Sequence, residues 1–70
     1  MPGHTDPNIT DREREILSRL ASGETPITIA PGMSLTLGQV KHSIAMVQSK
    51  LEAHNTTQAV AIAVRRKLIL

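Results

Sequence analysis

The chain has 70 residues, a formal net charge of +2, no Cys and no aromatic residue. A chain of this length forms one domain that buries only about 60% of its unfolded surface, so it is marginally stable alone. Without Cys it has no disulfide and no thiolate chemistry, which fits a reducing, cytosolic setting. The three His and six acidic residues show no metal-ligand spacing. We therefore expect no metal and no cofactor, and self-association is the natural way to bury more surface.

The absence of Phe, Tyr and Trp argues against proteins that bind single-stranded DNA or RNA, because these stack bases on aromatic rings. Duplex DNA, contacted at phosphates and groove edges, needs no aromatic residue. The longest apolar run, Ala59 to Val64, is far shorter than the roughly 20 residues that span a membrane.

Residues 1–8 lack the basic start and apolar stretch of a signal peptide, and they contain two Pro and one Gly. We expect them to be a flexible leader in front of a single domain, residues 9–70. The initiating Met1 favours a complete chain.

Charge is distributed unevenly along the chain. Residues 1–35 hold three Arg against five acidic residues, a net charge of −2, whereas residues 36–70 hold five basic residues against Glu52 alone, a net charge of +4. A basic half beside an acidic half favours a polyanion that approaches from one side. The alternative is a charge dipole that arose by chance.

The first helix is predicted to begin at Thr10, because Thr10 and Glu13 have the spacing of a capping box. Ile16, Leu17 and Leu20 then form an apolar stripe. Gly23 is then expected to end this helix.

The segment 25–33 gives the weakest pattern. Thr25 followed by Pro26 suits a helix start, whereas Pro31-Gly32 stops a helix within two turns. We predict a short helix over residues 26–30, of either α or 3₁₀ type. A strand is the alternative, although it has no partner to pair with.

A second capping box, Thr36 with Gln39, predicts the next helix. Its buried face has the helical spacing of Val40, Ile44, Val47 and Leu51. The opposite face is polar or small and nearly uncharged: Gln39, Lys41, His42, Ala45, Gln48 and Ser49. This face is suited to approach phosphate, and an ordinary solvated face is the alternative.

The last helix is predicted to begin near Asn55 or Thr56 and to end in the basic run 65–67. We expect Val60, Ala63, Val64 and Leu68 to cover the core. An exposed apolar seam is then predicted for self-association, made by Ala61, Ile62, Arg65 and Ile69. Scattered surface apolar residues are the alternative.

Two blocks of sequence, at a fixed distance, carry a family resemblance. The first is Ile9-Thr10-Asp11-Arg12-Glu13-Arg14-Glu15-Ile16-Leu17, followed by Leu20 and Gly23. The second comprises Val40-Lys41, Val47, Lys50-Leu51, Asn55-Thr56-Thr57-Gln58-Ala59-Val60 and the basic end Arg65-Arg66-Lys67-Leu68-Ile69. Over residues 9–69 and without a gap, the chain resembles the LuxR/FixJ/GerE-type helix-turn-helix DNA-binding domain.

The resemblance implies an all-α, four-helix LuxR-like fold that is unrelated to the winged helix. The segment 25–33 would be the first helix of the helix-turn-helix, residues 36–51 the recognition helix in the major groove, and residues 56–68 the dimerisation helix. The DNA contacts that it implies are Thr36, Gln39, Lys41, His42 and Lys50. We expect further phosphate contacts from Arg65, Arg66 and Lys67.

The middle of the chain departs from the family. Pro26-Ile27-Thr28-Ile29-Ala30 stands where the family has Asn-Lys-Glu-Ile-Ala, and Pro31-Gly32 replaces the next helical turn. Gly38 and Ser43 stand where the family often has Lys and His.

The prediction is a small transcriptional regulator that binds double-stranded DNA as a homodimer, in the cytoplasm with the nucleoid. The alternative is a protein-interaction module on the same fold that modulates another regulator or RNA polymerase without reading DNA. An enzyme is disfavoured, because no Ser has a His–acid pair beside it and Gly32 and Gly38 form no phosphate loop.

Overall fold

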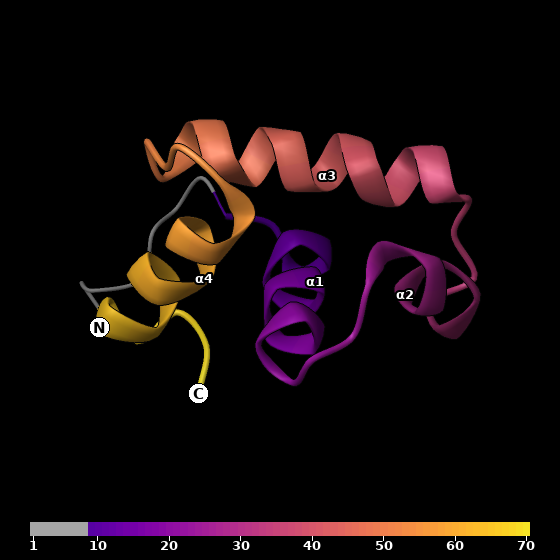
Figure 1. Cartoon of the computed structure of the whole chain (residues 1–70), viewed down its shortest axis with the longest axis horizontal. Helices are drawn as coiled ribbons and strands as arrows, with labels where there is room; N and C mark the ends of the chain where they lie inside the picture. Colours follow the sequence, from indigo (N-terminus) through magenta and orange to yellow (C-terminus); the bar gives the residue numbers. More distant parts are fainter. Residues whose placement is uncertain (1–8) are drawn as a thin grey trace.

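The computed structural model describes residues 9–70, and the predicted leader lies outside them. Four helices follow one another along this part of the chain: α1 (Asp11–Ala21), α2 (Pro26–Gly32), α3 (Leu37–Lys50) and α4 (Thr56–Arg65). Figure 1 shows α3 lying along one side of the molecule, with α4, α1 and α2 side by side beneath it. The predicted all-α, four-helix fold is confirmed.

The helix starts lie where the capping residues predicted them. The Glu13 N–H donates to Thr10 Oγ1 over 3.0 Å, and the Thr10 N–H donates to Glu13 Oε1 over 3.0 Å. Thr36 and Gln39 exchange the same two bonds, over 3.0 and 2.8 Å. At the start of α4, Asn55 caps the helix through its side chain. Each cap satisfies a backbone donor that the first turn leaves unpaired.

The second helix is longer than the predicted 26–30, and the alternative of a strand is wrong. Helix α2 is an α-helix of seven residues that runs through Pro31 to Gly32. Pro31 has no N–H for the Ile27 carbonyl, which would break a long helix. Here the interruption falls in the last turn, at an exposed residue, so little of the helix is lost.

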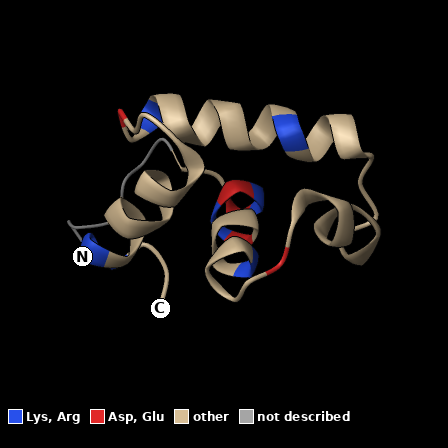
Figure 2. Ribbon diagram, in the orientation of Figure 1, with Lys and Arg blue, Asp and Glu red and all other residues tan. Residues whose placement is uncertain are grey.

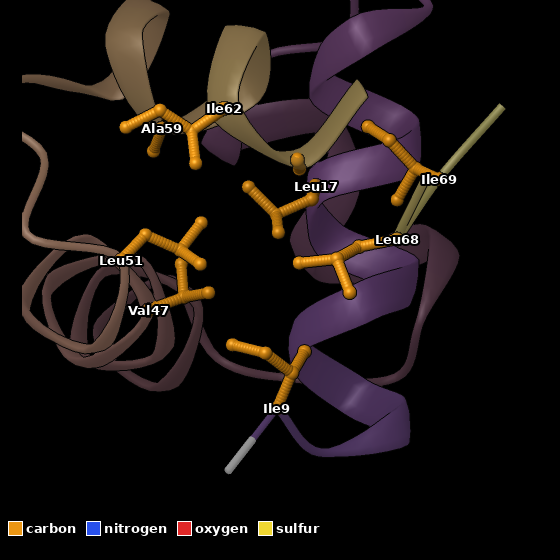
Figure 3. Close-up of a cluster of buried hydrophobic side chains, with 9 residues drawn as sticks. Ile9, Leu17, Val47, Leu51, Ala59, Ile62, Leu68 and Ile69 are labelled. Carbon is orange, nitrogen blue, oxygen red and sulfur yellow. The ribbon is translucent and has the colours of Figure 1, made fainter. Parts of the chain in front are cut away.

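The core consists of two clusters that share α1 and α3. One cluster joins α1, α2 and the first half of α3: Ile16, Ile29, Ala30, Val40 and Ile44. The other joins Ile9, α1, the second half of α3 and α4: Ile9, Leu17, Val47, Leu51, Ala59, Ile62, Ala63, Leu68 and Ile69. Figure 3 shows the side chains of the second cluster converging between these helices. The predicted stripe on α3 is therefore buried, and it holds α3 against all three other helices.

The predicted faces of α4 are wrong in part. Ile62 and Ile69 are buried at 8% and 9% exposure, so they cannot form an exposed seam, whereas Val64 is 45% exposed. All six residues from 59 to 64 are apolar, so their pattern does not select a face. The helix also ends at Arg65, and a turn with Lys67 at φ +61° brings Ile69 back to the core.

Each helix ends in a turn that needs a left-handed residue. The first such residue is Gly23. The other three have side chains and φ values between 56° and 61°: Ser34, Glu52 and Lys67. After α3, the Ala53 N–H donates to the Gln48 carbonyl over 2.9 Å, as in a Schellman motif. A residue with a Cβ is strained in this conformation by about 1 kcal/mol or more.

Replacing Glu52 by Gly should therefore raise the free energy of unfolding by about 1 kcal/mol relative to Glu52→Ala. Both changes remove the same charge from the end of α3, so their difference isolates the backbone strain. Urea denaturation of the two variants measures it. Equal stabilities would contradict the strain.

Candidate nucleic-acid interface

The outer face of α3 is the side of this helix that the other helices leave uncovered. Its exposed residues are Gly38, Gln39, Lys41, His42, Ala45, Met46 and Ser49. Figure 2 shows no acidic residue along α3, while acidic residues gather on α1. A polyanion would meet no repelling carboxylate on this helix.

The predicted contact residues on α3 differ in whether their side chains already have hydrogen-bond partners within the fold. The side chains of Thr36 and Gln39 are bonded to each other's backbone in the capping box. Lys41 and His42 are exposed and make no side-chain hydrogen bond or ion pair within residues 9–70. These two side chains are therefore the most available to a ligand.

Lys50 is held inside the fold. Its ammonium group lies 2.9 and 3.0 Å from the two carboxylate oxygens of Glu13 at the start of α1, and its side chain is only 24% exposed. A phosphate would have to compete with this carboxylate. No local sequence pattern predicts this pair, because its members are 37 residues apart.

Burial favours the neutral form of the Glu13 carboxyl and tends to raise its pKa. The hydrogen bonds from Lys50 and from the Thr10 N–H outweigh burial and hold the pKa of Glu13 below its ordinary value of 4.5. The carboxylate is therefore charged near neutral pH and ties the start of α1 to the end of α3.

The basic end of α4 does not join the α3 face. Arg65, Arg66 and Lys67 are exposed, and Figure 2 shows the basic turn after α4 on the side of the molecule away from α3. The predicted DNA contacts therefore fall into two separate groups, one on α3 and one at the C-terminal end of α4.

The two positions that depart from the family have different environments. A Cβ added at Gly38 would meet only the Thr36 hydroxyl oxygen, at 3.9 Å, so a larger side chain fits there. Ser43 is buried at 7% exposure and faces inward. Its small side chain therefore belongs to the packing of α3 against α1 and not to the outer face.

Comparison with known proteins decides the family. The model of the bacterial regulatory proteins of the luxR family matches residues 7–63. The chain belongs to this family. It therefore is a LuxR-type helix-turn-helix DNA-binding domain, a non-enzymatic class, as predicted.

Relatives carry this domain as part of a longer chain. The domain is 38% identical over 52 residues to the transcriptional regulatory protein DesR of Bacillus subtilis (strain 168). This match covers 74% of this chain and 26% of DesR. It is 39% identical over 61 residues to the response regulator VraR of Staphylococcus aureus (strain NCTC 8325 / PS 47), covering 87% of this chain and 29% of VraR.

The solved structure of the response regulator ChrA, from a heme-sensing two-component system, superposes with a TM-score of 0.86. It is 30% identical and covers 91% of this chain and 32% of ChrA. The chain thus spans about a third or less of the length of these relatives. Within residues 9–70, no helix is long and apolar enough to cross a bilayer.

The ion pair between Glu13 and Lys50 can be tested with Glu13→Gln, because Gln at the third helical position still completes the capping box. The change should lower the free energy of unfolding at pH 7 by about 1–2 kcal/mol. Since the folded-state pKa of Glu13 is lowered, the pair contributes fully above pH 4.5 and its contribution is lost as pH falls through the folded value.

Thermal or urea denaturation at pH 7 and at about pH 3 measures this dependence. The stability gap between the wild type and Glu13→Gln should shrink at acid pH. A gap that stays constant with pH would contradict the ion pair.

Proposed function

We propose that this domain regulates transcription by laying the outer face of α3 in the major groove of duplex DNA. The observation that carries the proposal is the uncovered, acid-free face on which Lys41 and His42 have no partner within residues 9–70. A helix of 14 residues is about 21 Å long, and the usual helix diameter of about 10–12 Å fits a major groove about 12 Å wide. A DNA-bound regulator of this kind would lie with the nucleoid in the cytoplasm.

The side chains on this face suit different parts of the duplex. Lys41, an exposed cation of α3, suits a phosphate. His42, near the middle of the face, can donate to a base edge such as that of guanine. Gln39 accepts the Thr36 N–H through its carbonyl oxygen, which leaves its amide N–H groups to donate to a base or a phosphate. We do not include Arg65 and Arg66, because they lie on the other side of the molecule.

We further propose that the domain dimerises through α4, with an interface that differs from the predicted seam. Ala61, Val64 and Arg65 have the spacing of one helical stripe, and all three are exposed. Val64 supplies apolar area at the centre of this stripe. A two-fold dimer would place two α3 helices on half-sites separated by about one helical turn of DNA.

A second function is supported by α2, which would make the domain a protein-interaction module for another regulator or RNA polymerase. No charged residue occurs in α2, and Ile27 is 73% exposed on it. A helix that crosses the DNA backbone binds its phosphates more tightly when it carries cations, and α2 has none. A gel shift with random duplex DNA at low salt separates the two functions, because a pure interaction module would give no shift at micromolar protein.

The substitution Lys41→Gln should weaken duplex binding and reduce the slope of log Kobs against log salt by about 0.9. A matched control is Lys67→Gln, which removes the same charge from the turn after α4. A fluorescence anisotropy titration at several salt concentrations measures both. If the two variants lose equal affinity, α3 is not the specific contact.

The substitution Val64→Glu should shift a dimer to monomer without loss of fold, because Val64 is already 45% exposed. Ile27→Glu is the control, since it places the same charge on an exposed apolar residue of α2. Sedimentation velocity of both variants reports the oligomeric state. A dimer that survives Val64→Glu would rule out this face of α4.

A further inference from the structure

An open hollow of about 390 Å³ lies between the start of α1 and one flank of α3. Its lining comes from both elements: Thr10, Arg12 and Glu13 on one wall, and His42, Ser43 and Met46 on the other. His42 and Met46 are also exposed residues of the outer face of α3. The hollow therefore continues the proposed DNA-binding face toward α1.

The charge of the hollow comes from Arg12. The carboxylate of Glu13 is neutralised by Lys50. The other arginines of α1 have acidic partners, since Arg14 lies 3.0 Å from Asp11 and Arg19 lies 2.9 Å from Glu15. Arg12 is exposed and makes no ion pair or side-chain hydrogen bond within residues 9–70. The hollow thus presents an unneutralised guanidinium on the wall opposite His42.

The position of Arg12 complements that of Lys41. With about 100° per residue, Lys41 and Met46 lie about 140° apart around α3, so they border opposite flanks of its outer face. Arg12 lies across the hollow from Met46, on the flank away from Lys41. Cations therefore border α3 on both sides.

A helix in the major groove has one phosphodiester backbone on each side of it. We propose that Arg12 binds a phosphate of one DNA strand while Lys41 binds a phosphate of the other. This inference rests on the proposed function. The guanidinium donates two N–H groups to the phosphate oxygens, and His42 lies on the opposite wall of the same hollow. Arg12 is thereby a DNA contact supplied by the acidic half of the chain.

The test compares Arg12→Gln with Arg14→Gln. The two variants remove the same charge two residues apart on the same helix, and only Arg12 lines the hollow. Affinity for a random-sequence duplex is measured by fluorescence anisotropy from about 50 to about 200 mM salt. Circular dichroism melting verifies that both variants fold.

Arg12→Gln should bind the duplex about threefold to tenfold more weakly at the lower salt and reduce the salt slope by about 0.9. Arg12→Lys should restore the slope, because the charge alone sets counterion release. Arg14→Gln should resemble the wild type.

Two results would overturn the inference, and they are distinguishable. If the wild type binds and Lys41→Gln weakens it, while Arg12→Gln matches Arg14→Gln, the role of Arg12 is wrong and the proposed function stands. If the wild type shows no binding even at low salt, the proposed function fails together with it.

Discussion

The carboxylate of Glu13 accepts hydrogen bonds from two parts of the chain, the backbone of Thr10 at the start of α1 and the ammonium group of Lys50 at the end of α3. Because the Glu13 side chain is only 7% exposed, hydrogen bonds from both donors are needed to stabilise its negative charge inside the fold. The pair fixes the end of α3 relative to α1. The direction in which the outer face of α3 points depends on this connection.

Packing fixes the rest of α3. Its first half is buried with α2, its second half with α4, and α1 contributes Ile16 to one cluster and Leu17 to the other. A fully buried aliphatic side chain contributes about 1.5–3 kcal/mol, so a few such residues account for much of the stability of a small domain. Helix α3 is thus a rigid support for the outer side chains that we propose contact DNA.

The sequence predicted the features that depend on near neighbours. The capping boxes at Thr10 and Thr36 act over three residues, and the stripe from Val40 to Leu51 acts over one or two turns. The face of α4 could not be predicted, because all of its central residues are apolar and the turn at Lys67 ends the helical register. The family resemblance implies a DNA contact for Lys50, and no local pattern in the sequence pairs Lys50 with Glu13. Arg12 likewise lies beside α3 only because the fold brings α1 and α3 together, so no neighbouring residue in the sequence predicts its position.

The proposed DNA-binding face comprises α3 and its flank at Arg12. The most direct test is a titration of ¹⁵N-labelled protein with random duplex DNA at low salt, followed by amide chemical shifts. We predict that the largest shifts fall within residues 36–49 and 10–13, while residues 64–70 change little. Large shifts confined to residues 64–70, with α3 unaffected, would contradict the claim.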